Sequence, residues 1–429
     1  MADAAPRLHA IVEQLLGTPL PMRIRAWDGS QAGPPEAPAL VVRNRRALRR
    51  MVFKPGELGL ARAWVAGDLE IEGDLFVAMD LLAGLVWERG DDARGLAEAV
   101  RDPRFRSAAL ELLKLAGPPL PPAPPPEEVR RARHHHTRRT DRQAISHHYD
   151  VGNDFYEIVL GPSMVYSCAY WPRPDGTLEE AQRDKLELVC RKLALRPGQR
   201  LLDVGCGWGS LAVHAAREHG VSVVGITLSG EQAAYARKRV ADAGLTDRVE
   251  IRVQDYRDVS DGPYDAISSI GMAEHVGAEK YLRYANDLHA LLVPGGRLLN
   301  HQISRRPQQD ESTYHLDGFI DSYVFPDGEL APVGTTVTQL ERAGFEVRDV
   351  EAIREHYALT LRRWVARLED DWQRAVRLTG PGRARVWRLY MAACAVGFER
   401  NRLGVNQVLA VRTPESGDSG MPLRARTWN

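Results

Sequence analysis

Hydrophobic and polar positions alternate differently in the two parts of this chain. In the first 117 residues, apolar residues recur at spacings of three and four, which predicts helices over 6–16, 59–66, 75–86 and 104–115. Short apolar runs around a Gly/Pro-rich loop predict two strands, at 22–27 and 39–43. We therefore expect residues 1–117 to form a small mixed α/β N-terminal accessory domain.

From residue 129 onward, short apolar runs alternate with longer amphipathic segments. Amphipathic spacing predicts helices over 231–243 and 280–291. The runs predict buried strands, one ending at Asp203 and others at 221–226, 248–253, 264–270 and 296–303. This order predicts right-handed βαβ units, and hence an α/β fold with a Rossmann-like, mostly parallel sheet.

A proline-rich stretch separates the two parts. Seven of the nine residues from Pro118 to Pro126 are proline, which excludes helix and favours extended polyproline II. The division that follows is an accessory domain at 1–117, a linker at 118–128 and a larger domain at 129–429.

The charge of the chain limits the classes of molecule that it is expected to bind. Lys+Arg and Asp+Glu both number 57, so the net charge of zero excludes a uniformly basic nucleic-acid-binding protein. Arginines still gather locally, at 43–50 and in a strip at 130–142. Each cluster is either a solvated face or a contact for anionic lipid headgroups. Three consecutive histidines at 134–136 point in different directions on a helix, so they cannot share one metal ion.

Four cysteines stand at irregular positions without a CxxC pair, which predicts neither a disulfide framework nor a zinc site, and no metal is expected. The N-terminus lacks the apolar core of a signal peptide, and no apolar run is long enough to span a bilayer. We expect a cytoplasmic protein that associates peripherally with the inner face of the cell membrane.

The strongest chemical signal is Asp203-Val204-Gly205-Cys206-Gly207-Trp208-Gly209, directly after a predicted strand. Glycines allow a tight turn and a close approach of backbone to ligand. The spacing is GxGxG rather than the dinucleotide GxGxxG, and an acidic residue ends the strand. This pattern is typical of S-adenosylmethionine-dependent methyltransferases, with Asp203 expected to orient the methionine end of the cofactor.

The ends of the next strands supply further candidates for the cofactor. The usual ribose-binding acid after the second strand is missing, and Thr227, Leu228 and Gln232 stand in its place. Asp255 and Tyr256, after the third strand, are expected to face the adenine.

Several segments in fixed order resemble the cyclopropane-fatty-acyl-phospholipid synthase family, which includes mycolic acid cyclopropane synthases. They are HYDVGNDFY at 148–156, MVYSCAYW at 164–171, LDVGCGWGS at 202–210, GITLSGEQ at 225–232, GMAEHVG at 271–277 and FIDSYVFP at 319–326. The stretch at 55–69 resembles the actinobacterial branch, which includes fatty-acid methyltransferases that make the 10-methylene precursor of tuberculostearic acid.

The resemblance implies methylation of a cis double bond in a phospholipid acyl chain, through a carbocation that loses a proton to give a cyclopropane or a 10-methylene product. It implies bicarbonate as the general base, held by Glu274, His301, Ile303, Tyr357 and the backbone of Cys168. Tyr166 and Ser167 would contact the cofactor. Residues 305–335 and 355–403 would cover the acyl chain. Aromatic faces would stabilise the cation, with candidates Tyr149, Tyr166, Tyr170, Tyr323 and Phe325.

The residues leave two alternatives open, a small-molecule N- or O-methyltransferase on the same fold and a non-catalytic lipid-binding protein. A structural role for single residues is also open, such as a core histidine at 301 or a helix-capping acid at Glu274. Expected partners are phospholipid acyl chains, an anionic membrane surface, a second copy of the chain and, for a methylene product, a separate reductase. Double-bond position and headgroup preference stay undetermined.

Overall fold

The protein is described by a computed structural model that covers residues 3–87, 103–129, 151–311, 314, 318–326, 328–423 and 426. The arginine-rich strip at 130–142, its three histidines and Tyr149 lie outside the described residues. The chain divides into two compact units, of which unit 1 is Met1–Arg130, Asp317–Val324 and Trp372–Val396. Unit 2 is Arg131–Leu316, Phe325–Asp371 and Gly397–Asn429.

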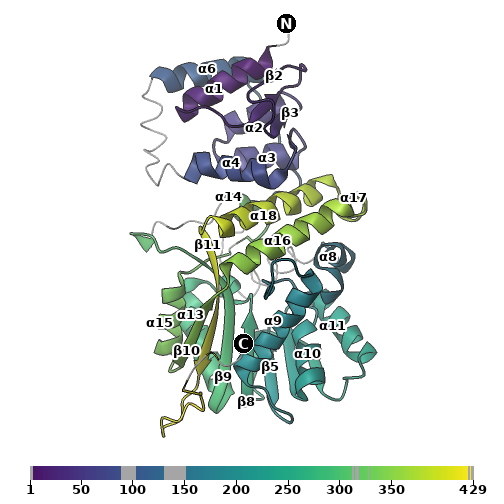
Figure 1. Cartoon of the computed structure of the whole chain (residues 1–429), viewed down its shortest axis with the longest axis vertical. Helices are drawn as coiled ribbons and strands as arrows, with labels where there is room; N and C mark the ends of the chain where they lie inside the picture. The colour runs from purple at the N-terminus through teal and green to yellow at the C-terminus, as the bar shows by residue number, and fades with distance from the viewer. Residues whose placement is uncertain are drawn as a thin grey trace. The chain divides into compact units, whose positions relative to one another are not determined.

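Unit 1 contains a four-stranded sheet in the order β2-β1-β3-β4. Its strands are β1 (Arg23–Arg25), β2 (Gln31–Ala32), β3 (Ala39–Val42) and β4 (Leu69–Glu72). Its helices from the N-terminal part are α1 (Ala4–Leu16), α2 (Arg46–Phe53), α3 (Glu57–Val65), α4 (Leu75–Trp87) and α6 (Pro103–Ala116). Figure 1 shows α1 and α6 side by side, where Arg7 pairs with Glu111 at 2.8 Å. The four helices and two strands expected here are present, whereas α2, β2 and β4 were not predicted.

The arginine cluster at 43–50 is partly used inside unit 1. Asp68 is buried, and its carboxylate accepts hydrogen bonds from Arg46 at 3.1 Å and Arg50 at 3.0 Å. Arg45 lies 5.5 Å from the ring centroid of Trp27. Because a buried carboxylate needs such partners, at least Arg46 and Arg50 stabilise the fold.

Unit 1 also takes in α14 (Gly318–Tyr323), α17 (Trp372–Thr379) and most of α18 (Pro381–Glu399). The sequence-based boundaries placed all three in the larger domain, so the structure divides the chain differently. The contacts explain why, because Arg385 donates to the carbonyl of Trp64 at 2.6 Å and the Trp64 indole donates to the carbonyl of Arg385 at 2.9 Å.

Unit 2 is built on a seven-stranded sheet in the order β10-β11-β9-β8-β5-β6-β7. The strands are β5 (Arg200–Val204), β6 (Ser222–Thr227), β7 (Val249–Val253), β8 (Tyr264–Ile270), β9 (Leu292–Arg305), β10 (Glu346–Ala352) and β11 (Leu403–Val411). β11 runs antiparallel to both β10 and β9, and the other neighbouring pairs are parallel, so the predicted mostly parallel sheet is confirmed.

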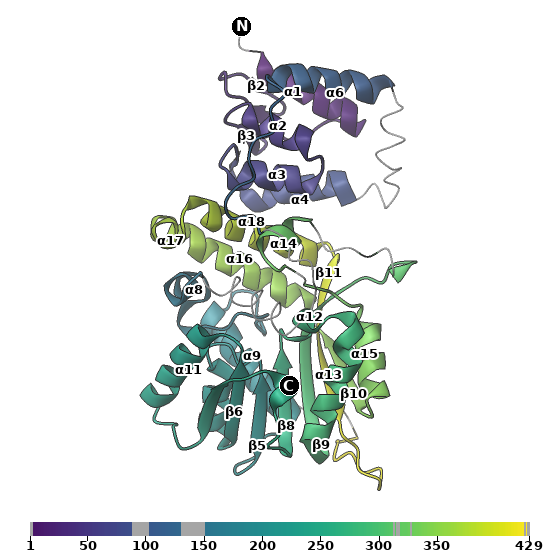
Figure 2. The same ribbon diagram turned by 180° about the vertical axis from the view of Figure 1, so that it is seen from behind.

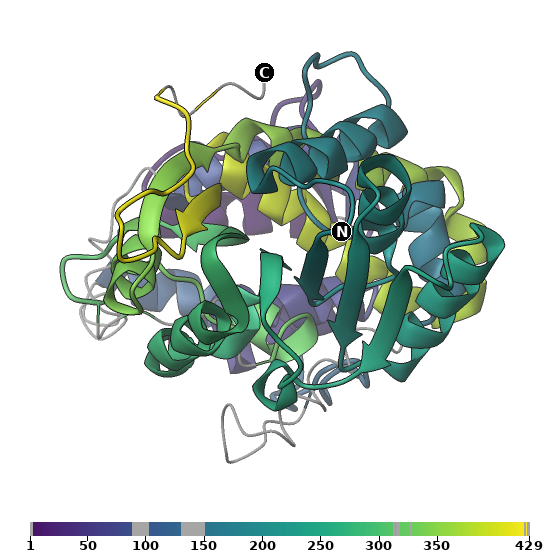
Figure 3. The same ribbon diagram turned by 90° about the horizontal axis from the view of Figure 1, so that it is seen from below.

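Successive residues of the central strands face opposite sides of this sheet, and both sides are covered. Leu201 and Val223 belong to one apolar cluster, whereas Leu202 and Val224 belong to another. The first cluster lies under α9 (Leu178–Leu193), α10 (Ser210–His219) and α11 (Gly230–Asp242), and the second under α13 (Ala278–Leu291) and α15 (Val333–Arg342). Figures 1 and 2 show these layers from the two sides, and Figure 3 shows the strands between them.

The remaining helices of unit 2 lie near the carboxyl ends of the parallel strands. They are α8 (Asn153–Leu160), η1 (Gly161–Ser163), η2 (Tyr256–Asp258), α12 (Ala273–Val276) and the longer α16 (Arg354–Asp370). Among the described residues, no helix combines the length and apolarity needed to cross a membrane.

Candidate active site

A cavity opens in unit 2 at the carboxyl ends of β5, β6 and β8. Most residues expected to bind the cofactor line it, namely Tyr166, Ser167, Asp203, Gly205, Gly207, Thr227, Leu228, Gln232, Asp255 and Tyr256. The five expected catalytic residues and Gly209 do not line it. Ligands of open parallel sheets bind at this edge, so the cavity is the candidate site for the expected cofactor.

The glycine turn after β5 brings backbone to the cavity wall. The N–H groups of Gly205 and Cys206 both donate to the carbonyl of Ile226, at 3.0 and 2.9 Å. Gly205 has φ +79°, and a Cβ there would lie 2.6 Å from the Met272 side chain. A side chain at this position would therefore be strained and would clash.

Gly209 has a different reason to be glycine. Its φ is +78°, and a Cβ would lie 3.0 Å from the Cβ of Ala236 on α11. Gly209 therefore lets α10 and α11 pack closely, and its expected contact with the cofactor stays a prediction.

Asp203 lies at the floor of the cavity beside a lysine that the sequence analysis did not consider. Its carboxylate accepts from the Ser268 hydroxyl at 2.7 Å, and burial raises its pKa to about 6. Lys185, from α9, is buried and donates to the Ser167 hydroxyl at 3.0 Å. Burial lowers the pKa of Lys185 to about 8. The two groups place opposite charges at the end of the cavity where the cofactor's charged amino-acid part is expected.

The two polar residues after β6 contact each other. The Thr227 hydroxyl donates to Oε1 of Gln232 at 2.8 Å, and both side chains are buried. Ser229 caps α11 by accepting from the backbone N–H of Gln232 at 3.2 Å. This leaves the Gln232 amide NH₂ group as a donor at the cavity wall, in the place where a ribose-binding acid is usual.

The main side-chain contacts of Asp255 are with Arg257, two residues later in the sequence. Its carboxylate accepts from the backbone N–H of Arg257 at 3.0 Å and pairs with the Arg257 guanidinium at 2.5 Å. The Tyr256 ring lies edge-on to Tyr284, with centroids 4.8 Å apart. The ion pair orients the loop, and Tyr256 offers an aromatic wall for the expected adenine.

Glu274, in α12, has an unusual carboxyl group. Its Oε1 accepts from the backbone N–H of Ile303 in β9 at 2.8 Å. Its Oε2 is buried and lacks a hydrogen-bond partner among the described residues. Burial raises the pKa of Glu274 to about 7. A helix-capping role does not account for these contacts, because the carboxyl bonds to another strand.

His301, in β9, is held in one neutral form by its neighbours. Lys192 donates to Oε1 of Gln407 at 2.7 Å, so the Gln407 amide nitrogen is the group that faces Nδ1 of His301 at 3.2 Å. Nδ1 therefore accepts, and the proton of the neutral ring is assigned to Nε2. Burial lowers the pKa of His301 to about 3, and its Nε2 has no hydrogen-bond partner within the described part of the chain.

Of the remaining expected catalytic residues, Ile303 and Cys168 are connected through backbone contacts, whereas Tyr357 is placed by ring packing. Ile303 is paired with Val405, whose carbonyl accepts from Ile353, and the Cys168 thiol lies 3.8 Å from the Ile353 carbonyl. Burial raises the pKa of Cys168 well above its ordinary value, so a thiolate role is disfavoured. Tyr357, one turn into α16, packs its ring against Phe398 at 4.8 Å.

Aromatic rings lie next to the cavity. Tyr166 lines it and packs against Tyr156 at 5.7 Å and Trp364 at 5.4 Å between centroids. Phe325 lies 5.7 Å from His275, another lining residue. Tyr170 instead stacks on His356. Tyr323 belongs to unit 1, where its hydroxyl donates to Glu128 at 2.9 Å. Of the four candidates within the described residues, Tyr166 is the one that lines the cavity.

Some lining residues were not among the sequence candidates, namely Lys185, Arg257 and Lys280, whereas Trp208, Met272 and His275 lie in the expected motifs but were given no role. Lys185 had a detectable signal, because it occupies a buried position in an amphipathic helix where lysine is rare. The others lie in loops or helix ends whose direction depends on tertiary packing.

Comparison with known proteins agrees with this geometry. Residues 136–408 match the family model described as mycolic acid cyclopropane synthetase. A Mycobacterium tuberculosis protein described as "Probable fatty acid methyltransferase Rv3720" is 46% identical over 409 residues, 94% of each chain. The "Tuberculostearic acid methyltransferase UfaA1" of the same species is 34% identical over 421 residues, 94% of this chain and 91% of that one.

A solved structure has the same fold as the part of this chain that it matches. The mycolic acid cyclopropane synthase CmaA1, in complex with SAH and CTAB, superposes with a TM-score of 0.60 at 34% identity, over 63% of this chain and 98% of that chain. Cofactor-binding candidates line one cavity at the expected edge of the sheet. The chain belongs to the mycolic acid cyclopropane synthetase family and is an S-adenosylmethionine-dependent methyltransferase.

Proposed function

We propose that this protein transfers a methyl group to the cis double bond of an unsaturated phospholipid acyl chain, such as oleoyl. The observation that carries the proposal is the pair of buried, unpartnered polar atoms, Oε2 of Glu274 and Nε2 of His301. Unsatisfied buried groups of this kind are costly and point to a bound polar species. The relatives named as fatty-acid methyltransferases support a lipid substrate.

The two atoms fit bicarbonate, which carries both a hydroxyl donor and carboxylate acceptors. Nε2–H of His301 is a donor, and the carboxyl group of Glu274 can accept. The backbone of Cys168 and the hydroxyl of Tyr357 are further candidates to hold it, while the N–H of Ile303 already holds Glu274. When bound, bicarbonate would supply a general base for the proton lost from the carbocation.

The chain's own residues would bind and shield the reacting groups. Asp203 and Lys185 would hold the charged end of the cofactor, and the glycine turn would admit it. The face of Tyr166 would stabilise the cation, an attraction worth about 2 kcal/mol when water is excluded. The apolar wall formed by Leu186, Leu211 and Ile270 keeps water from the cation.

The cation can lose its proton in two ways. Loss of a proton from the added methyl closes a cyclopropane directly. If the hydrogen of the methyl-bearing carbon first shifts as hydride to the cation, loss of a proton from the same methyl gives a 10-methylene group instead. We favour the methylene product because the full-length relatives include a tuberculostearic acid methyltransferase. Such a product would need a separate reductase to become a methyl branch.

The test is incubation of the purified chain with S-adenosylmethionine and anionic vesicles that contain monounsaturated phospholipid. Mass spectrometry should show one carbon added to the acyl chains, and proton NMR should separate cyclopropane from methylene protons. Vesicles with only saturated chains are the control. Unmodified acyl chains together with a methylated amine or hydroxyl compound would contradict the lipid assignment.

A further inference from the structure

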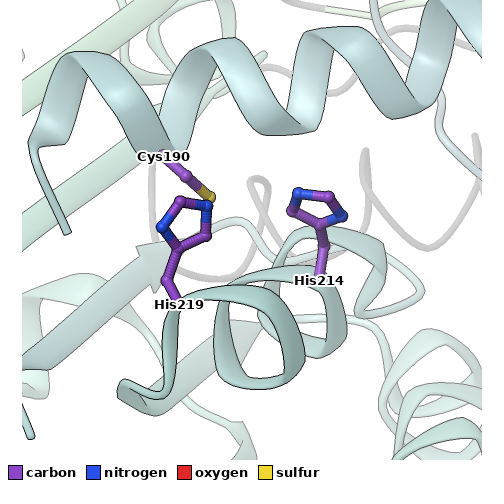
Figure 4. A group of neighbouring side chains, drawn as sticks. All are labelled: Cys190, His214 and His219. Carbon is purple, nitrogen blue, oxygen red and sulfur yellow. The ribbon is translucent and has the colours of Figure 1, made fainter. Parts of the chain in front are cut away.

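Three metal-ligand side chains meet between two helices of unit 2, away from the residues that line the cavity. Cys190 comes from α9, and His214 and His219 come from α10. One ligand atom from each lies within 4.8 Å of the other two. Figure 4 shows the thiol of Cys190 and the two imidazole rings turned toward one another. We call these three residues the Cys190 cluster.

A carboxylate lies next to the two histidines of the cluster. Oε2 of Glu187, three residues before Cys190 on α9, lies 3.1 Å from Nε2 of His214 and 3.1 Å from Nε2 of His219. In a tetrahedral zinc site with bonds of 2.0–2.3 Å, neighbouring ligand atoms lie roughly 3.3–3.8 Å apart. The carboxylate oxygen is already near this separation from each of the two nitrogens. The ligand atoms of Cys190, His214 and His219 lie within 4.8 Å of one another, so the thiol would move closer to the nitrogens when a metal binds.

A purely structural explanation covers part of this arrangement. Glu187 could simply bond to the two histidines, and its other oxygen accepts from Arg191 at 2.8 Å. That explanation does not require a thiol on the same side of both rings. Cys190 and His214 are buried, and His219 is only 17% exposed, so the cluster is largely withheld from water.

We propose that Cys190, His214, His219 and Glu187 bind one Zn²⁺ ion in a tetrahedral structural site. Zinc accepts mixed sulfur, nitrogen and oxygen donors without redox chemistry. Binding replaces the proton on the Cys190 sulfur, which leaves to solvent, and uses the Nε2 lone pairs of the two histidines. Arg191 then remains as an outer partner that orients Glu187.

The site would link the two helices that flank one side of the cavity. Lys185 and Leu186 of α9 and Ser210 and Leu211 of α10 line the cavity. A metal joining Glu187 and Cys190 to His214 and His219 would hold these segments in register. Zinc is therefore expected to raise thermal stability and to tighten cofactor binding indirectly.

The experiment uses the full chain, stripped of metal with a chelator and titrated with Zn²⁺ or Co²⁺. We expect one zinc per chain by elemental mass spectrometry, a higher unfolding midpoint, and a near-ultraviolet thiolate-to-Co²⁺ absorption band. Cys190→Ser should abolish the band and weaken zinc binding by more than about 100-fold, because loss of an outer partner alone costs 10- to 100-fold.

Matched variants distinguish the proposed zinc site from other cysteines and histidines of the chain. Cys394→Ser removes a cysteine of unit 1 and should keep the band and the affinity. His219→Gln, at a partly exposed helix end, tests the site if Cys190→Ser proves unstable by circular dichroism. Replacing His134, His135 and His136 together by Gln should change nothing. Absence of the band in the unmodified chain, its persistence in Cys190→Ser, or loss of zinc only in the triple variant would overturn the proposal.

Discussion

Burial sets the protonation of the two residues that we place nearest the chemistry. Glu274 bonds through one carboxyl oxygen to β9, and the other oxygen is buried. His301 is kept neutral by burial and oriented by Gln407 and Lys192. A neutral imidazole that donates through Nε2 and a carboxyl group with a pKa near neutrality are each suited to holding an exchangeable proton.

Replacing Glu274 by Gln should lower turnover by at least about 100-fold, the usual contribution of a residue in general acid–base catalysis. Cofactor affinity should stay near normal because the side chain does not line the cofactor cavity. Steady-state kinetics and calorimetric titration of the cofactor product measure the two effects. Glu279→Gln, an exposed change on neighbouring α13, is the control. Full activity of the Glu274 variant would remove its assigned role.

The same residue predicts a pH dependence of stability. The pKa of Glu274 rises from 4.5 to about 7 on folding, so the folded chain keeps a proton that the unfolded chain releases. Its contribution is present below pH 4.5 and is lost as pH rises toward 7, by at most about 3 kcal/mol at 1.36 kcal/mol per pKa unit. Urea unfolding across this range should therefore show wild type losing stability relative to Glu274→Gln. Parallel profiles would refute the shift.

At the scale of elements, two glycines of the turn after β5 are required for different reasons. Gly205 makes room for Met272 at the cavity, whereas Gly209 makes room for Ala236 where α10 meets α11. Spacing in the sequence predicted the turn but assigned all three glycines to the ligand. The partner of each Cα depends on which helix packs against it, and sequence spacing does not contain that information.

Gly209→Ala should therefore destabilise the protein by about 1–3 kcal/mol, from left-handed backbone strain and the close Ala236 contact. Gly230→Ala is the matched control in α11, since nothing lies within 4 Å of its Cβ position and its φ is not positive. That variant should be neutral or slightly stabilised. Denaturant unfolding of both variants provides the comparison, and equal stability would contradict the packing role.

For the whole molecule, the proline-rich stretch is an incomplete guide to the division of the chain. Residues 372–396 lie in sequence between β10 and β11 of the methyltransferase sheet but belong to unit 1. Arg385 bonds to the carbonyl of Trp64 and pairs with Glu70 at 2.6 Å, and its guanidinium lies 4.7 Å from the Trp64 ring centroid. The N-terminal residues thus complete the packing of α18.

Deleting residues 1–117 should leave α18 with uncovered apolar surface. Trp387, Met391 and Ala395 are among its buried residues. We expect the shortened chain to aggregate or to unfold at lower temperature, as judged by size-exclusion chromatography and circular dichroism. Arg385→Ala in the full chain, which removes the bonds to Trp64 and Glu70, should shift stability in the same direction. A shortened chain as stable as the parent would show that the linker is a true boundary.

Membrane association is predicted from the arginine-rich strip just after the linker. Neutralising it should weaken binding to anionic vesicles and reduce its salt dependence, since each charge near the surface contributes about 1 kcal/mol. The residues to change together are Arg130, Arg131, Arg133, Arg138 and Arg139. A control changes the exposed residues Arg173, Arg183 and Arg217. Vesicle sedimentation at several salt concentrations measures the binding of each variant. Unchanged binding of the variant without the strip would place the membrane contact elsewhere.

Local patterns in the sequence predicted the parallel sheet, the glycine turn and most elements of both parts. They did so because period, turn residues and strand order are properties of nearby residues. Short elements such as the two-residue β2 and the arginine-rich α2 were not predicted, because few of their residues are buried.

By itself, then, the sequence determined the fold class and the cofactor chemistry through contiguous segments. Tertiary structure alone decided which distant residues meet. It brought Lys185 beneath the cofactor cavity, Gln407 against His301, and Arg385 against Trp64. The spacing of the cysteines in the sequence did not predict the Cys190 cluster for the same reason, since its members lie on two helices. Such contacts form only when separate elements pack, because helix faces and strand register then determine which side chains approach one another.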